Sequence, residues 1–371
     1  MPRELIASAP RTPALRTYHE ALLGPGEVRI RTELASPKHG TELVGYRNDP
    51  VASRPYDPAW GAVIPQDPER TLASFPRRLG NMAVGIVTEC GPDVTRFTVG
   101  DRVFGHLPIR ETHTVGQDRV DPLPPDLAPE AALCLDPVVM ALAIRDAGIR
   151  LGDRLAVFGL GAIGLIAAQL ARLAGAGMVI VVDPIAARRD LALRHGADLA
   201  IDPASESNGD TGLAIRRLTG PPAANLPAGA RIVGGYVERP TQGTDLGVDV
   251  AIETSGSVGA LQQAIRATRF GGTVCVVSFY GRVAAGLLLG DEFHINQLTL
   301  QSVRAESLPM RDAPGWTLDR MVHLGLDWLR SGRIRTDGIL SPIVPFADAV
   351  EAYRAIDEHP DQSIKLGIRF P

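Results

Sequence analysis

Two hydrophobic patterns follow one another along the chain. Up to about residue 145, short runs with apolar residues at alternate positions are separated by turns rich in proline and glycine. These runs predict β-strands, of which the clearest cover residues 28–34, 83–89 and 102–104. The first part of the chain is therefore expected to form an irregular, mostly antiparallel β domain.

From about residue 151, continuous apolar runs alternate with segments of helical periodicity. The apolar runs predict buried strands at 154–158, 178–182, 199–201, 248–253 and 272–279. Helices are predicted between them, at 164–174, 186–195 and 259–267. Strands that alternate with helices form a parallel sheet with right-handed crossovers, so an α/β domain is expected here. Further on, helices are predicted at 318–330 and 346–358, and a closing strand at 364–370.

Two segments fit neither pattern. Residues 48–78 contain many prolines and little periodicity, which predicts a surface loop or flap. Residues 203–247 are longer than one crossover requires and include the run PPAANLPAGA, which predicts an insertion. The residues of these segments do not indicate their roles.

Composition excludes several classes of protein. The 371 residues are 45% hydrophobic, which excludes wholesale disorder, and the length allows about two domains. With 38 basic and 42 acidic residues the net charge is −4, so neither nucleic acid nor an anionic membrane is an expected partner. The three cysteines lie far apart without a CxxC pair, which excludes a disulfide framework and a four-cysteine zinc lobe.

The sequence predicts neither a membrane span nor a secretory signal. The longest uncharged run, residues 155–171, is shorter than the ~20 apolar residues that a membrane-spanning helix needs. The first residues, MPRELIASAPRTP, lack the apolar core of a signal peptide. The expected location is the cytoplasm.

The run 155–171 is better explained as a dinucleotide-binding motif, in which a buried strand leads through GxGxxG into a helix. Gly159 permits a tight turn, Gly161 lets the backbone approach a pyrophosphate, and Gly164 allows the helix to pack closely on the strand. The helix N-terminus then faces the phosphates. Ala162 and Ile163, between the last two glycines, are expected to contact the cofactor as well.

The next predicted strand ends in Asp183. An acidic residue at this position hydrogen-bonds the 2′-hydroxyl of a ribose and repels a 2′-phosphate, so NAD is expected rather than NADP. Arg188 is a further candidate for cofactor contact, although Arg188 and Arg189 also suit a solvated helix face. The alternative for the whole motif is a glycine-rich turn in which Asp183 caps the following helix.

A β-rich first part, this fingerprint in mid-chain and a returning last segment together resemble the medium-chain dehydrogenase/reductase superfamily. The specific stretches are GIVTECGPDV from Gly85, FTVGDRVF from Phe97, IETSGS from Ile252 and SIKLGIR from Ser363. The resemblance implies a GroES-like β-rich catalytic domain packed against a Rossmann domain with a doubly wound parallel sheet, and an active site between them. Such enzymes transfer a hydride between a nicotinamide cofactor and an alcohol, aldehyde, ketone or enone.

The resemblance also implies domain boundaries and an assembly. Residues 1–147 form the first part of the catalytic domain, 148–290 the Rossmann domain, and 291–371 the return segment that completes the catalytic domain. The predicted strand 272–279 ends the Rossmann sheet, and the equivalent edge pairs across a two-fold axis in related proteins. A homodimer or homotetramer is therefore expected, with the apolar residues 283–290 in that contact or, alternatively, in a buried loop of one subunit.

The chain departs from zinc-dependent members of this superfamily at the first two of their three ligand positions. Those members carry a cysteine where this chain has His39, and a histidine followed by glutamate where it has Asn81 and Met82. The third position, Asp136, retains a carboxylate. Asn81 is a poor zinc ligand and Met82 suits only soft metals, so no metal is expected, although His39 and Asp136 leave one open. Segments 36–42, 80–85 and 293–296 are similar to a zinc-lacking branch that includes bacteriochlorophyllide and sugar dehydrogenase-like proteins.

Without zinc, a positioned acid or hydrogen-bond donor must stabilise the substrate oxygen. His39 is the first candidate because it replaces the metal-binding cysteine; its alternative is to cap the following turn. Lys38 is a second donor or an ordinary exposed lysine. Asp136 orients His39, binds a substrate hydroxyl, or caps a helix. Asn81 suits polyhydroxylated substrates, and the polar set favours a sugar, cyclitol or polyol.

The remaining candidates are cofactor contacts at strand ends. They are Thr254, Ser255, Val277, Ser278, Phe279 and, as the resemblance implies for a phosphate contact, Lys365. His106, His113 and His294 either reach the substrate or the domain junction or are ordinary surface or core histidines. The three cysteines are expected to be inert core residues.

These observations favour an NAD-dependent oxidoreductase that acts on a hydroxyl/carbonyl pair without catalytic zinc. One alternative is an NAD(P)H-dependent enone or ketone reductase, since an enone receives its hydride on carbon and needs no metal. The other is a non-catalytic NAD(H)-binding sensor that has lost its metal.

Overall fold

The structure is a computed structural model. It describes residues 1–49, 56–63, 74–205, 210–220, 232–233, 236–237, 246–280, 283–307 and 310–371. The described chain divides into two compact units. The first consists of Met1–Pro137 and Val322–Pro371 with Val283, and the second of Val138–Tyr280 and Ala284–Met321. The domain boundaries expected from the sequence, 1–147, 148–290 and 291–371, stay a prediction.

The first unit is built mainly of antiparallel strands from both ends of the chain. One sheet has the order β2-β1-β6, and a larger sheet the order β10-β8-β7-β3-β20-β19, with β9 also paired to β3. The strands are β1 Arg3–Ala9, β2 Thr12–Thr17, β3 Glu27–Ser36, β6 Arg77–Arg78, β7 Met82–Cys90, β8 Arg102–Gly105, β9 Thr112–Gly116, β10 Asp121–Pro122, β19 Leu340–Pro345 and β20 Lys365–Arg369. The predicted strands at 28–34, 83–89 and 102–104 are confirmed as β3, β7 and β8. Two short antiparallel pairs lie outside these sheets: β4 Tyr56–Asp57 with β5 Ala62–Val63 in the first unit, and β14 Ile232–Val233 with β15 Tyr236–Val237 in the second.

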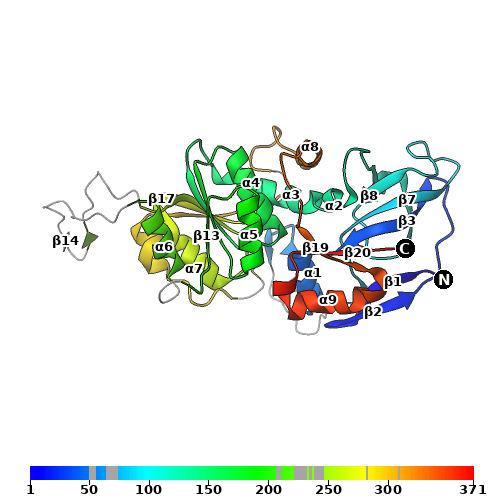
Figure 1. The fold of residues 1–371 in the computed structure, drawn as a ribbon, viewed down its shortest axis with the longest axis horizontal. Coiled ribbons are helices and arrows are strands. Elements are labelled where there is room, and N and C mark those ends of the chain that lie inside the picture. The colour runs from blue at the N-terminus through cyan, green and yellow to red at the C-terminus, as the bar shows by residue number, and fades with distance from the viewer. Residues whose placement is uncertain are drawn as a thin grey trace. The chain divides into compact units, whose positions relative to one another are not determined.

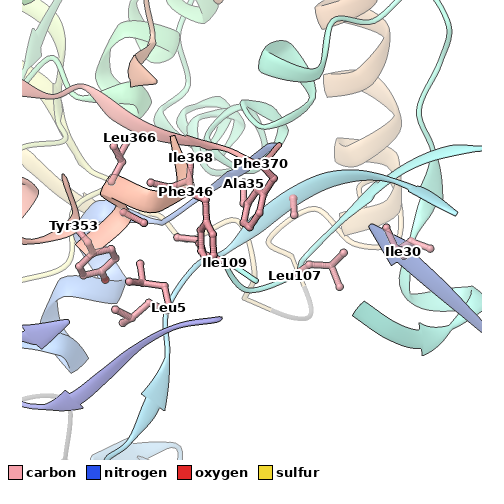
Figure 2. Close-up of a cluster of buried hydrophobic side chains, with 14 of the residues drawn as sticks. Leu5, Ile30, Ala35, Leu107, Ile109, Phe346, Tyr353, Leu366, Ile368 and Phe370 are labelled. Carbon is pink, nitrogen blue, oxygen red and sulfur yellow. The ribbon is translucent and has the colours of Figure 1, made fainter. Parts of the chain in front are cut away.

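Apolar side chains from both chain ends form the core of the first unit (Figure 2). Leu5 of β1, Leu366 and Ile368 of β20, and Tyr353 of α9 (Ala349–Glu358) meet there. Since Leu366 and Ile368 point into this core, alternation along β20 directs Lys365 to the opposite face of the strand. The helices α1 His39–Tyr46 and α2 Pro129–Ala132 also belong to this unit. Two helices cross the boundary between the units: α3 Leu135–Ala141 begins in the first unit, and α8 Leu318–Arg330 ends in it.

The second unit is a doubly wound α/β structure around six parallel strands in the order β13-β12-β11-β16-β17-β18. The strands are β11 Arg154–Phe158, β12 Met178–Val182, β13 Leu199–Ile201, β16 Val248–Glu253, β17 Thr268–Val276 and β18 Thr299–Ser302. The helices are α4 Ala162–Leu173, α5 Ala186–Arg194, α6 Thr211–Leu218 and α7 Val258–Ala267. In Figure 1, α4 and α5 lie on one side of the sheet and α6 and α7 on the other. The expected Rossmann architecture is confirmed.

Two local expectations are wrong. The strand predicted at 272–279 is β17, which ends at Val276, so Val277, Ser278 and Phe279 follow the strand. This strand does not end the sheet, because β18 pairs with it in parallel. The short, half-polar β18 lacks the continuous apolar run by which the other strands were found. The helix predicted at 346–358 is confirmed, with a first 3₁₀ turn, Phe346–Asp348, that leads into α9.

Much of the predicted flap and insertion lies outside the described residues. The parts not described within them are 50–55, 64–73, 206–209, 221–231, 234–235 and 238–245, which include the PPAANLPAGA run. Among the helices that the structure describes, none combines the length and apolar character needed to cross a bilayer.

Candidate active site

The three motif glycines join β11 to α4 in the second unit. Gly159 has a φ of 90°, and a Cβ added there would meet the Ser255 Cβ at 2.7 Å. A Cβ on Gly164 would overlap the carbonyl oxygen of Gly159, so the helix packs directly on the turn. A Cβ on Gly161 would meet no atom within 4 Å. The space beside Gly161, where α4 begins with Ala162 and Ile163, therefore suits a pyrophosphate at a helix N-terminus.

Asp183 is buried at the end of β12 and supports the same turn. Its carboxylate accepts a hydrogen bond from the Leu160 backbone N–H at 2.7 Å and one from the Ile185 N–H at 2.9 Å. The Arg188 guanidinium lies 3.8 Å from the carboxylate, and Arg189 donates to the Asp183 carbonyl oxygen at 2.7 Å. A carboxylate has further acceptor capacity beyond these two bonds, so contact with a ribose hydroxyl stays a prediction for Asp183.

A buried carboxylate that the sequence reasoning missed organises the ends of β16 and β17. Glu253, the last residue of β16, is fully buried and accepts a hydrogen bond from the Ser255 backbone N–H at 2.7 Å. The hydroxyls of Ser255, Ser278 and Tyr280 all donate to the same carboxylate. Burial, and next the contact with Glu253, raises the pKa of the Tyr280 hydroxyl. The run of hydroxyl residues after Glu253 in IETSGS was the signal for this cluster.

Of the other residues expected to contact the cofactor, two make hydrogen bonds within the protein and one has an exposed side chain. The Thr254 hydroxyl donates to the Gly159 carbonyl oxygen at 2.7 Å, so it holds the glycine turn. The Val277 backbone N–H donates to the Glu253 carbonyl oxygen at 2.9 Å. The Phe279 side chain is exposed. Whether these residues contact a cofactor stays a prediction.

In the first unit, Lys38 and Asp136 form an ion pair. The Lys38 Nζ lies 3.0 Å from the Asp136 Oδ1. Asp136, in the first turn of α3, is almost entirely buried, with a side-chain exposure of 4%, whereas 21% of the Lys38 side chain is exposed. The pair thus has one buried and one accessible member, and its accessible member is a proton donor.

His39 starts α1 and faces the return strand. Its Nε2 accepts a hydrogen bond from the Leu366 backbone N–H at 2.9 Å, so Nε2 carries no proton in this arrangement. The adjacent Lys365 is buried, and its Nζ donates to the Pro37 carbonyl oxygen at 3.0 Å. His39 and Lys365, which the sequence suggested as a substrate acid and a phosphate contact, therefore both belong to the contact between the Pro37–His39 segment and β20.

Glu42 links α1 to other parts of the first unit through its carboxylate. The sequence did not point to this role. The Tyr353 hydroxyl donates to its Oε1 at 2.6 Å and the Gly80 backbone N–H to the same oxygen at 2.9 Å. The Lys38 backbone N–H reaches the other oxygen at 3.3 Å. Desolvation raises the pKa of Glu42, although these donors oppose the shift. Tyr353 lies far away in the sequence, so no local pattern pointed to this contact.

Asn81 lies beside the end of β3, where its backbone N–H donates to the Ser36 carbonyl oxygen at 3.0 Å. Its Oδ1 lies 3.4 Å from the His106 Nδ1. The other histidines lie elsewhere: His113 is buried on β9, and burial lowers its pKa to about 3, while His294 is exposed. Cys134 and Cys275 are fully buried, as expected, and burial raises their pKa values to about 11 and about 12.

The donor atoms at the three family ligand positions are turned toward protein groups. The Nε2 of His39 faces the Leu366 amide, Asp136 faces Lys38, and the Oδ1 of Asn81 faces His106. Across the described ranges, no three histidine, cysteine, aspartate or glutamate side chains come together as a metal site would require. The residues present do not fit a resident catalytic zinc ion.

Comparisons with known proteins agree with both units. Residues 24–120 match the alcohol dehydrogenase GroES-like domain, and residues 162–317 match the zinc-binding dehydrogenase family. The D-guloside 3-dehydrogenase of Escherichia coli K12 is 39% identical over 376 residues, which cover 99% of this chain and 100% of that protein.

Two solved structures cover the whole chain. An Escherichia coli oxidoreductase of unknown specificity involved in membrane biogenesis superposes with a TM-score of 0.71 at 20% identity, covering 100% of both chains. The 2R,3R-butanediol dehydrogenase of Bacillus subtilis superposes with a TM-score of 0.70 at 22% identity, covering 100% of this chain and 99% of the other. At these identities the structures establish the fold.

Proposed function

Because this chain belongs to the medium-chain dehydrogenase/reductase superfamily and is an alcohol or polyol dehydrogenase of that family, we propose that it oxidises a ring or chain hydroxyl of a sugar, glycoside, cyclitol or polyol, with NAD and without catalytic zinc. The observation that carries the proposal is the Lys38–Asp136 ion pair at a family ligand position. A full-length relative that acts on a guloside favours a sugar hydroxyl over a simple alkyl alcohol.

Two further polar side chains of the first unit support a polyhydroxylated substrate. Asn81 and His106 lie side by side, and the amide of Asn81 offers both a donor and an acceptor. A substrate that presents several hydroxyls can use such groups, whereas a plain alkyl alcohol would leave them unpaired, and unpaired polar groups oppose binding.

The second unit fits a nicotinamide dinucleotide. Gly161 and the first amides of α4 would hold its pyrophosphate, and Asp183 places negative charge where an adenosine 2′-phosphate would lie, which favours NAD. When bound, this cofactor takes up the hydride that leaves the carbinol carbon. The Gly159 turn, held by Thr254, keeps the site preorganised.

Lys38 is the group we place at the substrate oxygen. During oxidation the C–H electron pair leaves as hydride, the O–H bond breaks, and a carbonyl and one proton result. The ammonium of Lys38 stabilises negative charge on that oxygen, and its neutral amine form is the proton acceptor. In the reverse direction the ammonium gives its proton to the oxygen. His39, whose Nε2 faces Leu366, takes a supporting role here.

A substrate panel tests the proposal. Purified protein is mixed with NAD or NADP and with sugars, methyl glycosides, cyclitols, polyols and simple alcohols, and NADH or NADPH formation is followed by absorbance. We expect turnover with a polyhydroxylated substrate and with NAD preferred over NADP. Turnover restricted to enones would favour the reductase alternative, and bound NADH without turnover would favour the sensor.

We also propose a homodimer or a homotetramer built from such dimers. Among the described strands, β18 pairs only with β17, which leaves its other edge unpaired. Apolar side chains of Leu300 on this strand and of Val283, Leu288 and Leu289 are exposed. Light scattering after size exclusion tests the assembly, and a monomer at micromolar concentration would contradict it. The cytoplasmic location stays a prediction.

A further inference from the structure

The whole chain contains only two lysines, Lys38 and Lys365, so that 36 of its 38 basic residues are arginines. The two lysines lie in the same part of the first unit, because the Lys365 Nζ donates to the carbonyl oxygen of Pro37, the residue before Lys38. Arginine carries the same charge on a broad, planar group, whereas the ammonium of lysine is compact and releases its proton more readily. In a chain that uses arginine everywhere else, two neighbouring lysines indicate that this place requires ammonium groups.

Two consecutive residues of β20 hold the turn on which Lys38 stands. The Lys365 Nζ donates to the Pro37 carbonyl oxygen at 3.0 Å, and the Leu366 backbone N–H donates to the His39 Nε2 at 2.9 Å. The side chain of Leu366 lies in the core beside Ile368 (Figure 2), which fixes the strand. Lys38 is thus flanked on both sides by groups fastened to the return segment.

Lys365 is buried close to two carboxylates, a thiol and the other lysine. Only 4% of the residue is exposed. Burial lowers the pKa of its amine, while Cys134, Asp136 and Glu42 oppose that shift and Lys38 adds to it. The side chains of Lys365, Lys38, Asp136 and Glu42 are therefore close enough to interact electrostatically. Burying an amine removes its hydration, which costs free energy. Folding must therefore supply interactions that keep Lys365 at this buried position.

We infer that Lys365 is a positioning residue whose buried ammonium, together with the Leu366 amide, holds the Pro37–His39 turn so that Lys38 faces Asp136. The inference rests on the proposed function, because it names the support of the group that we place at the substrate oxygen. It replaces the role suggested by resemblance, a contact to the cofactor phosphate. A phosphate contact needs an accessible ammonium, and Lys365 has a buried one.

Kinetics and cofactor binding separate the two roles. We compare Lys365→Met with Arg369→Gln, a matched control that removes an exposed cation four residues along the same strand. We expect Lys365→Met to lower kcat about 30-fold, with the Kd for NADH within about twofold of wild type, and the control to change neither. A loss of NADH affinity of about tenfold or more with kcat retained would assign Lys365 to the cofactor and overturn the inference.

Two lysines also allow a readout that needs no substrate. Protein labelled with ¹³C at lysine Cε gives two lysine signals, assigned by Lys365→Met and Lys38→Met. We expect the Lys38 signal to move in Lys365→Met and to stay in place in Arg369→Gln. An unmoved Lys38 signal would overturn the positioning role. If no substrate is turned over, the proposed function fails and this spectrum still decides the role of Lys365.

A third measurement uses the wild-type chain, so it stands even if Lys365→Met does not fold. Reductive methylation with ¹³C-formaldehyde and peptide mapping shows which amines react. In native protein we expect Lys38 to be methylated and Lys365 to react about 100 times more slowly than Lys38. After denaturation we expect both lysines to react. Equal reactivity of the two lysines would show an accessible Lys365 and contradict the inference.

Discussion

The Nζ of Lys38 lies 3.0 Å from the Oδ1 of Asp136, at a position where zinc-dependent relatives place a metal ligand. This contact has two consequences. It turns the carboxylate away from metal binding, and it fixes a proton-donating cation on an accessible side chain. Our account of the chemistry depends on this pair.

Replacing Lys38 tests the role of its ammonium. Lys38→Met removes the charge and the proton, and we expect kcat to fall about 1000-fold with the Kd for NADH unchanged. Lys38→Arg keeps the charge but hardly releases a proton, so we expect a smaller loss of about 100-fold. Steady-state kinetics in both directions measure the effect. Equal and minor losses in both variants would remove Lys38 from the reaction.

Replacing Asp136 tests the buried side of the pair. Asp136→Asn leaves Lys38 without its partner, and we expect a lower kcat and a loss of about 1–2 kcal/mol in the free energy of unfolding. Asp126→Asn is the matched control, because its ion pair with Arg330 is exposed and contributes little. Urea unfolding of both variants measures the difference. Similar stabilities for the two variants would show that the Lys38–Asp136 pair is as weak as a surface pair.

The glycine turn gives a pair of substitutions with opposite expectations. Gly161→Ala meets no atom within 4 Å, so we expect unchanged stability but an NADH Kd raised about tenfold or more. Gly164→Ala forces a Cβ onto the Gly159 carbonyl, so we expect it to lower the thermal midpoint as well. Calorimetry and NADH fluorescence titration measure the two effects. Full NADH affinity in Gly161→Ala would place the cofactor elsewhere.

Buried His113 makes the stability of the protein depend on pH. Burial lowers its folded-state pKa from 6.5 to about 3, so the unfolded chain binds a proton there first as the pH falls. The free energy of unfolding is therefore retained above pH 6.5 and lost between pH 6.5 and about 3, by up to about 1.4 kcal/mol per unit.

Urea unfolding at pH 7, 6 and 5 checks this dependence. We expect His113→Leu to lose less stability over that range than wild type, and the exposed-site control His294→Gln to follow wild type. Parallel curves for His113→Leu and wild type would assign the acid sensitivity to other groups.

The sequence predicted the parts of the fold that depend on local pattern. The apolar runs located β11, β12, β13 and β16, and the GxGxxG spacing located the turn before α4. The exposed strand β18 was missed because its short, half-polar sequence carries no such pattern. Its place at the sheet edge follows from pairing with β17, which only the folded chain shows.

The sequence predicted which residues belong to the candidate site better than it predicted what those residues contact. The residues at the zinc-ligand positions of related enzymes, His39, Asn81 and Asp136, could be read from the sequence. The direction of each side chain could not, since the partners of His39 and Glu42 come from Leu366 and Tyr353, more than 300 residues away. The count of two lysines was the signal for the cluster around Pro37.

Turnover by metal-free protein shows whether the enzyme works without zinc. The purified enzyme is dialysed against 1,10-phenanthroline and then a metal-free buffer, its metal content is measured by mass spectrometry, and kcat is determined with the substrate found in the panel. We expect less than about 0.1 zinc per chain and an undiminished kcat, because Lys38 and Asp136 serve where zinc-dependent enzymes need three protein ligands. Loss of turnover on chelation, with recovery on adding Zn²⁺, would contradict this expectation.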